Sequence, residues 1–290
     1  MYALICGLVR PIIARLKHAM TDPSTLRPLD TFPAADRRAI RCVFTDIDDT
    51  LTTDGRLGAM AYTAMERLQD AKIMVIPITG RPAGWCDHFA RMWPVDAVVG
   101  ENGAFYFRYD RNARRMTRRF DQPDGERAAN RERLSAVQDR ILAEVPGCAV
   151  ANDQAYRETD LAIDFCEDVP RLPQTDVDRI VELFVEAGAV AKISSIHVNG
   201  WFGSFDKLTM ARNLMTEVFE VDLKAENAHF VFTGDAPNDS PMFGFFENSI
   251  GVANVLDFQD RLDAEPAYIT TRRGGEGFAE AVSSLLDAHA

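Results

Sequence analysis

The chain has 290 residues, 47% of them hydrophobic and 26% charged, so it can bury a sizeable core and a second unit, and its composition excludes wholesale disorder. The formal net charge of −12 argues against nucleic acid or an anionic membrane as the main partner, because both favour positively charged surfaces. The five cysteines are scattered without any C-x-x-C spacing, which predicts neither a disulfide framework nor a zinc site and favours a reducing, cytoplasmic location.

The start of the chain reads as an extension. Its apolar opening, MYALICGLV, runs for only nine residues before Arg10, which is too short to span a bilayer, and it lacks the basic start of a signal peptide. We therefore expect residues 1–38 to lie outside the main fold, without stable membrane insertion. Met20 leaves a different translation start open.

The first third of the main fold has a β-α-β-α-β pattern. Apolar runs that end in turn or acidic residues alternate with stretches of helical spacing, which predicts a parallel sheet with right-handed crossovers. The expected strands cover 41–49, 72–79 and 96–105, and the expected helices cover 59–71 and 81–93.

The middle of the chain changes character. Two short strands around a polar turn predict a hairpin rather than a crossover, and they are followed by helix, strand, helix and strand. The expected strands are 104–110, 115–120, 159–165 and 192–202, and the expected helices are 125–147 and 175–188. We interpret residues 106–202 as an inserted α+β unit with an antiparallel sheet.

The parallel pattern then resumes with helices at 207–219 and 240–246 and strands at 229–235, 249–253 and 267–271. The sequence thus predicts an α/β, Rossmann-like core formed by residues 39–105 and 203–290, interrupted by the inserted unit. In such open sheets, ligands bind beyond the carboxyl ends of the parallel strands.

Acidic residues follow two of the predicted strands. Asp46 and Asp48 stand two apart at the end of the first strand, and Asp235 and Asp239 flank Asn238 at the end of another. Carboxylates so close repel one another unless a cation lies between them, and Mg²⁺ favours one or two carboxylates together with water and a substrate phosphate. Either cluster alone also fits an ordinary turn, but together they favour a shared metal site.

Two weaker features complete the set. Thr79 and Gly80 end the second predicted strand and offer a hydroxyl group and main-chain N–H groups to a phosphate, although Thr-Gly at a strand end is usually only a turn. Lys207 begins a helix after the inserted unit, where most lysines are merely solvated.

In this order, the four motifs resemble those of the haloacid dehalogenase (HAD) superfamily of aspartate-nucleophile phosphohydrolases. They are Asp46-Ile47-Asp48-Asp49-Thr50, Thr79-Gly80-Arg81, Lys207, and Gly234-Asp235 through Asn238-Asp239. The inserted unit, together with Glu101-Asn102-Gly103 before it, is similar to the large α/β cap found in one subgroup of this superfamily. That subgroup contains the sucrose-phosphate, trehalose-phosphate and mannosyl-phosphoglycerate phosphatases, the Cof-type hydrolases and phosphomannomutase. The resemblance covers about residues 38–285; one departure is Asp49, where many members have glycine.

The resemblance implies a role for each motif. Asp46 would be the nucleophile that forms an aspartyl-phosphate, and Asp48 would be the general acid and base. Mg²⁺ would bind Asp46, the Asp48 carbonyl and Asp235, with Asp239 supporting the metal or Lys207. The phosphate would be held by Thr79, Gly80, Lys207 and Asn238.

Residues that contact the leaving group of the substrate are harder to predict. The candidates are Arg81, Glu101, Asn102, Arg157, His197 and Asn199. Strand alternation would send Ser195, His197 and Asn199 to one face, but an ordinary exposed face of the sheet is the stronger interpretation. The six arginines between Arg108 and Arg119 could attract an anion, yet on a hairpin a solvated role is favoured.

The sequence leaves three functions open. The first is a phosphatase for a small phosphorylated metabolite such as a sugar phosphate. The second is a phosphomutase of the phosphomannomutase type, and the third is a catalytically idle binding module, which the intact motifs disfavour. The oligomeric state, monomer or homodimer, is not indicated.

Overall fold

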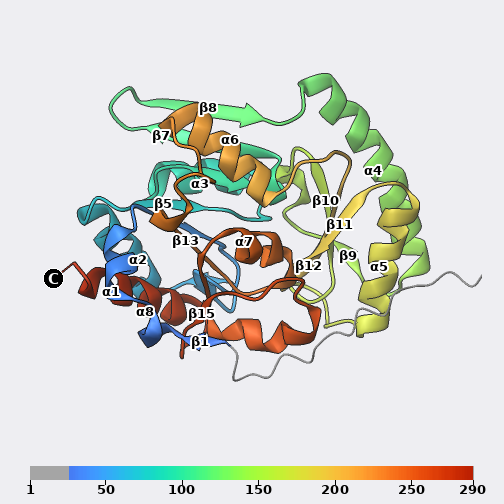
Figure 1. Cartoon of the computed structure of the whole chain (residues 1–290). Helices are drawn as coiled ribbons and strands as arrows, with labels where there is room; N and C mark the ends of the chain where they lie inside the picture. Colours follow the sequence, from blue (N-terminus) through green and yellow to red (C-terminus); the bar gives the residue numbers. More distant parts are fainter. Residues whose placement is uncertain (1–25, 290) are drawn as a thin grey trace, which may run out of the picture.

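A computed structural model describes residues 26–289 (Figure 1). Its central sheet has six parallel strands in the order β1-β15-β14-β13-β2-β5. The chain places β5 on one side of β2 and β13 on the other. Because the three strands are parallel, their carboxyl ends lie side by side. The strands of this sheet are β1 (Arg27–Pro28), β2 (Cys42–Thr45), β5 (Met74–Pro77), β13 (Phe230–Gly234), β14 (Asn248–Gly251) and β15 (Tyr268–Ile269).

Helices cover both faces of this sheet because its strands are apolar on both sides. On one face, Val43, Val75 and Val231 pack with α2, α3 and α8, and on the other Phe44, Ile76 and Phe232 pack with α6 and α7. The helices of this part are α1 (Ala34–Ala39), α2 (Ala59–Asp70), α3 (Ala83–Met92), α6 (Lys207–Phe219), α7 (Ser240–Phe245) and α8 (Gly274–Asp287). The predicted α/β class with a Rossmann-like core is therefore confirmed. Helix α8 was not predicted from the sequence pattern.

The predicted hairpin is present, but it joins the core rather than the antiparallel sheet of the inserted unit. Strand β7 (Phe105–Asp110) pairs with β8 (Arg115–Phe120) and also with β6 (Val98–Gly100), and it packs against α3. The preceding strand therefore determines where the hairpin lies. A second small hairpin, β3 (Thr52–Thr53) with β4 (Arg56–Leu57), follows β2.

The part of the chain from α4 to β12, which we call the cap, forms a separate layer with its own sheet (Figure 1). The antiparallel order is β11-β12-β10-β9, and α4 and α5 cover one face around Leu161, Ile163 and Val198. The single strand expected at 192–202 is in fact two strands joined by a turn at Ser194. The elements are α4 (Asp124–Glu144), β9 (Ala149–Val150), β10 (Asp160–Asp164), α5 (Gln174–Glu186), β11 (Val190–Ile193) and β12 (His197–Trp201).

The expectation that residues 1–38 lie outside the main fold is wrong for residues 26–38. Strand β1 pairs with β15 at the edge of the central sheet, and Phe32 is 1% exposed and stacks on Tyr268 with ring centroids 4.4 Å apart. The buried aromatic ring, the strand pairing and the buried Leu29 together attach this segment to the core. Residues 1–25 and the expectations about Met20 lie outside the described residues.

The division into a core (39–105 and 203–290) and an insert (106–202) remains a prediction. In the described part of the chain, no helix combines the length and apolar character needed to cross a membrane.

Candidate active site

The site begins where β2 and β13 end together. The two strands are parallel neighbours, and the main-chain N–H of Asp46 donates to the carbonyl of Thr233 at 2.8 Å. Asp46 and Asp235 each follow the last apolar residues of their strand, so this pairing brings them to one edge of the sheet. Two motifs almost two hundred residues apart in the chain thus form one site.

Three buried carboxyl groups meet at this edge. Each of Asp46, Asp235 and Asp239 places one carboxylate oxygen within 4.8 Å of the others. Burial raises the pKa of Asp46, and burial together with the charges of Asp46 and Asp239 raises the pKa of Asp235 well above its ordinary value. Such a cluster is unfavourable without added positive charge.

The residues present fit a magnesium ion. Asp235 Oδ2 is buried without a hydrogen-bond partner in the described structure, while its Oδ1 accepts from Thr50 Oγ1 at 2.9 Å. An unpaired buried carboxylate oxygen beside a second carboxylate is a suitable hard ligand for a divalent cation. Thr50 thus orients Asp235, a contact that the sequence analysis did not assign.

Lys207 supplies one positive charge to the cluster. Its Nζ lies 2.7 Å from Asp46 Oδ1 and 2.6 Å from Asp239 Oδ1, and the residue is 3% exposed. Burial alone would lower the pKa of Lys207, but Asp239 and Asp46 raise it above its ordinary value. The ammonium group is therefore held charged beside the expected nucleophile.

The start of α6, which carries Lys207, is fixed by the turn at 101–103. Asp206 caps the helix by accepting from the N–H of Thr209, and a Cβ at Gly103 would lie 2.0 Å from the carbonyl oxygen of Asp206. Gly103 also has a φ of +106°, so both its backbone and its surroundings require glycine. The close contact sets the position of the lysine.

Asp239 supports the loop rather than lying free. Its second oxygen, Oδ2, accepts from the N–H of Asp235 at 3.0 Å, while Oδ1 binds Lys207. This arrangement agrees with the expected support of Lys207. Asn238 lines the neighbouring cavity, and its Oδ1 has no partner within the described residues.

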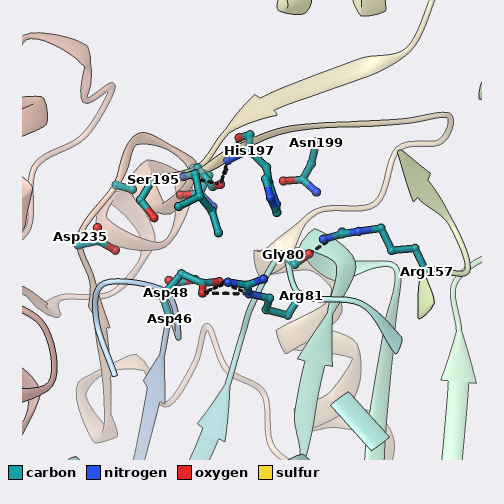
Figure 2. A pocket seen from close by; sticks show the side chains of 13 residues that line it. Asp46, Asp48, Gly80, Arg81, Arg157, Ser195, His197, Asn199 and Asp235 are labelled. Atoms are coloured by element: carbon teal, nitrogen blue, oxygen red, sulfur yellow. Dashed lines mark hydrogen bonds and ion pairs between the residues drawn. The ribbon is translucent and has the colours of Figure 1, made fainter. Parts of the chain in front are cut away.

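Asp48 points away from the acidic cluster to a different cation. Its carboxylate accepts from Arg81 Nε at 2.9 and 3.0 Å and lies 2.8 Å from the same residue's Nη2. The repulsion expected between Asp46 and Asp48 is thus relieved by two separate partners, because Asp46 pairs with Lys207 and Asp48 pairs with Arg81. Figure 2 shows the contact between Asp48 and Arg81. Asp48 remains at the edge of the cavity.

The second motif lies beside these acids. Thr79 is completely buried, and its Oγ1 accepts from the main-chain N–H of Arg81 at 3.0 Å. A Cβ at Gly80 would lie 3.2 Å from Asn102 Nδ2, so the turn at 101–103 packs closely on this loop. Asn102 Nδ2 has no hydrogen-bond partner in the described part of the chain.

The cap covers the site with polar side chains. Ser195, His197 and Asn199 are buried and line the cavity opposite Asp46 and Asp48, as Figure 2 shows. The predicted shared face is correct, and the interpretation of this face as exposed is wrong. The fold explains the difference, because α4 and α5 cover the other face of the cap sheet and leave this face against the core.

Arg157 and Glu101 join the cap to the core. Arg157 Nη1 donates to the carbonyl of Gly80 at 2.9 Å and to Asp160 at 3.0 Å. The carboxylate of Glu101 accepts from the N–H groups of Ala83 in the core and of Thr159 in the cap, at 2.9 and 2.7 Å. Glu101 therefore binds main-chain groups of both parts and is not among the residues that line the cavity.

Sequence reasoning missed Glu167 and Asp153. Glu167 Oε1 lies 2.7 Å from Arg81 Nη2, and Asp153 Oδ2 lies 3.4 Å from Arg81 Nη1. Both belong to loops of the cap, where an acidic residue is indistinguishable from an ordinary turn residue. Most arginines of the β7–β8 hairpin are exposed, in agreement with their predicted solvated role.

The comparisons with known proteins agree with this geometry. Residues 43–127 match a family model described as haloacid dehalogenase-like hydrolase. No curated protein matches the sequence. Solved structures match with low identity over most of both chains. Protein 0175 of Thermoplasma acidophilum is 19% identical, with a TM-score of 0.64 and coverage of 85% of this chain and 98% of that chain.

Two further matches carry descriptive names. A HAD/COF-like hydrolase of Plasmodium vivax is 17% identical, with a TM-score of 0.62 and coverage of 88% of this chain and 98% of that one. The sucrose-phosphatase of Synechocystis, solved with sucrose and phosphate, is 15% identical, with a TM-score of 0.59 and coverage of 86% and 98%. Residues 43–127 of this chain are thus similar to haloacid dehalogenase-like hydrolases, and most of the chain shares the fold of these solved structures.

Proposed function

We propose that the protein is a magnesium-dependent phosphatase that hydrolyses a small phosphorylated metabolite, such as a sugar phosphate, through an aspartyl-phosphate on Asp46. The observation that carries this proposal is the convergence of Asp46, Asp235, Asp239 and Lys207 on one buried point. These residues come from three separate segments of the chain, and an ordinary turn does not explain such a convergence.

Asp46, Asp235 and the main-chain carbonyl of Asp48 would hold Mg²⁺, while Asp239 holds Lys207 and the loop. When bound, the ion supplies positive charge that lets a phosphate dianion approach these carboxylates.

In the first step, a carboxylate oxygen of Asp46 attacks phosphorus while the bond to the leaving oxygen breaks. Asp48 gives its proton to that oxygen, so it must first separate from Arg81. In the second step, Asp48 takes a proton from water, the water oxygen attacks phosphorus, and the bond to Asp46 breaks, which releases inorganic phosphate.

The other side chains position the phosphoryl group. Lys207 neutralises its oxygens, and Thr79, Gly80 and Asn238 hold it from the side of the second and fourth motifs. Closure of the cap over the site would exclude bulk water during the reaction.

The substrate, partners and location belong to the same proposal. The sucrose-phosphatase similarity and the polar cap face support a sugar phosphate. We propose a cytoplasmic protein without a nucleic-acid partner, because the acidic surface disfavours polyanions.

The test is hydrolysis of p-nitrophenyl phosphate with and without Mg²⁺. We expect metal-dependent release of phosphate, loss of turnover by about 10³-fold or more in Asp46→Asn, and normal turnover in Asp70→Asn, which changes an exposed aspartate at the end of α2. Activity that survives in Asp46→Asn would reject the proposal. Isomerisation of a hexose 1-phosphate, primed by a hexose bisphosphate and without free phosphate, would favour the phosphomutase alternative.

A further inference from the structure

One guanidinium nitrogen links the core to the cap beside the active site. Arg81 Nη2 lies 2.8 Å from Asp48 Oδ1 of the core and 2.7 Å from Glu167 Oε1 of the cap. Glu167 Oε2 in turn lies 2.9 Å from His197 Nε2 on β12. Glu167 is therefore as close to the guanidinium as Asp48 is, and it approaches from the cap.

Negative charge exceeds positive charge in this region. Arg81 and Arg157 line the cavity, and both are already bound to carboxylates. The carboxylates around these two guanidinium groups are those of Asp48, Asp153, Asp160 and Glu167. Each arginine is thus neutralised, and neither offers an unused positive charge to a ligand.

The ionisation of Glu167 is strongly favoured. Partial burial opposes it, but the interactions with His197 and Arg81 outweigh burial and lower the pKa of Glu167 to about 2. Its side chain keeps 27% of its surface exposed, and it lines a cavity of about 260 Å³ together with Asp48, Arg81 and Ser195. This cavity lies next to the acid that would protonate the leaving oxygen.

We propose that Glu167 is a specificity-determining residue that restricts this enzyme to leaving groups without a second anionic group. The inference rests on the proposed function. Its ion pair with Arg81 occupies the guanidinium that lies beside Asp48, which a second carboxylate or phosphate of the substrate could otherwise bind, and its own charge repels that group. A neutral, hydroxylated leaving group can instead donate hydrogen bonds to Glu167.

The same reasoning weighs against the phosphomutase alternative. A hexose bisphosphate must place its second phosphate under the cap, where a like charge beside Glu167 and Asp48 is unfavourable in a poorly solvated site. Among the described residues the cap presents one cation without an ion pair on this face, Lys192, which is paired in register with Asn199. It lines a different cavity from Glu167, together with Lys207 and Asn238. Arg157, the arginine that the cap contributes to the cavity lining, is 7% exposed and fully engaged.

Arg171 is the residue whose charge would oppose the effect of Glu167. It lines the same cavity as Glu167 and is exposed, and within residues 26–289 it makes no ion pair. Its guanidinium lies 6.0 Å from the ring centroid of Phe165. If this arginine recruits an anionic leaving group, its removal must change the preference, so it provides the matched control.

The experiment compares matched pairs of substrates that differ by one carboxylate. The pairs are sorbitol 6-phosphate with 6-phosphogluconate, and glycerol 3-phosphate with 3-phosphoglycerate. The full-length wild-type protein, Glu167→Gln and Arg171→Gln are assayed with Mg²⁺ for kcat/KM. Each ester is also measured as an inhibitor of p-nitrophenyl phosphate hydrolysis, so an ester that is not turned over still reports binding.

We expect the wild type to favour the neutral member of each pair by about tenfold or more, in turnover or in inhibition. Glu167→Gln should reduce this ratio by about fivefold or more, because the amide keeps the size of the side chain and removes its charge. Arg171→Gln should leave the ratio unchanged. A general loss of folding or activity would lower both members of a pair together and would not move their ratio.

Equal or better use of the anionic member by the wild type would overturn the proposal, and so would a ratio that Glu167→Gln does not change. A ratio controlled by Arg171 would also reject it. Failure to hydrolyse p-nitrophenyl phosphate at all is a different result, since it removes the proposed function itself.

Discussion

Lys207 Nζ lies 2.7 Å from Oδ1 of Asp46, although 160 residues separate the two in the chain. The lysine begins α6 after the cap, and the aspartate ends β2 before it. The return of the chain from the cap to the core is therefore fixed beside the proposed nucleophile. Both residues are almost fully buried, so neither charge is tolerated without the other.

Removal of this ammonium group should affect chemistry more than binding. We expect Lys207→Met to lower kcat by about 10²–10³-fold, because developing charge on the phosphoryl oxygens loses its fixed partner. Lys224→Met, at an exposed position, is the control and should keep full activity. Steady-state kinetics with p-nitrophenyl phosphate measure both, and a Lys207→Met enzyme with normal kcat would contradict the assignment.

Asp235 should be required for metal binding but not for the stability of the metal-free protein. Asp235→Asn removes one of three mutually repelling carboxylates, so we expect the metal-free variant to be at least as stable as the wild type. The rise in Tm on adding Mg²⁺ should disappear in the variant and persist in Asp70→Asn. Thermal denaturation with and without Mg²⁺ checks this, and an equal rise in all three proteins would speak against Asp235 as a ligand.

Glu101 should stabilise the protein without lining the active-site cavity. Its carboxylate faces N–H donors of Ala83, Glu158 and Thr159, so an amide group in Glu101→Gln would place its own N–H against a donor. We expect a loss of about 1–3 kcal/mol in the free energy of unfolding. Urea denaturation measures it, with the exposed Glu66→Gln as control. Unchanged stability would show that these hydrogen bonds are not retained in solution.

The contacts of Glu167 give a pH dependence with a defined sign. The pKa of Glu167 is lowered to about 2 in the folded protein, below its ordinary value of 4.5. A lowered pKa means that stabilisation is present above pH 4.5 and is lost as the pH falls toward 2. The stability difference between wild type and Glu167→Gln, on the order of 2 kcal/mol at neutral pH, should shrink across this window. A difference independent of pH would exclude the ion pair as its cause.

Phe32 should anchor the segment before the first motif. Because the ring is buried and stacks on Tyr268, we expect Phe32→Ala to cost about 3–5 kcal/mol in the free energy of unfolding. Met60→Ala, at a side chain that is 49% exposed, is the control and should change little. Chemical denaturation distinguishes them. If Phe32→Ala is as stable as Met60→Ala, residues 26–38 are not anchored by this ring and behave as an extension outside the main fold.

The sequence was sufficient for the parts of the site that lie at strand ends. An apolar strand followed by acids predicts both the strand and the direction of the side chains, and parallel strands bring such ends together. Asp46, Asp235 and Thr79 lie together for this reason, since β2 has β13 and β5 as its neighbours. Lys207 needed the resemblance as well, because a lysine at the start of a helix carries no local signal.

The elements that sequence reasoning missed depend on tertiary contacts. Strand β1 has only two residues and no hydrophobic alternation, so nothing local marks Arg27–Pro28 as the edge of a sheet. The hairpin at Phe105–Phe120 was expected from its residues, but its place was decided by pairing with β6. Glu167 meets Arg81 across 86 positions of sequence, and only the fold of the cap brings them together.

The position of Glu101 constrains how the cap can move. Its carboxylate holds the main chain of the core at Ala83 and of the cap at Thr159, while Glu167 and Arg81 form a separate contact across the same boundary. The contact at Glu101 is fully buried and the one at Glu167 is partly exposed, so solvent competes for the second first. If the cap opens, we therefore expect it to separate from the core first at Glu167, while the hydrogen bonds of Glu101 persist.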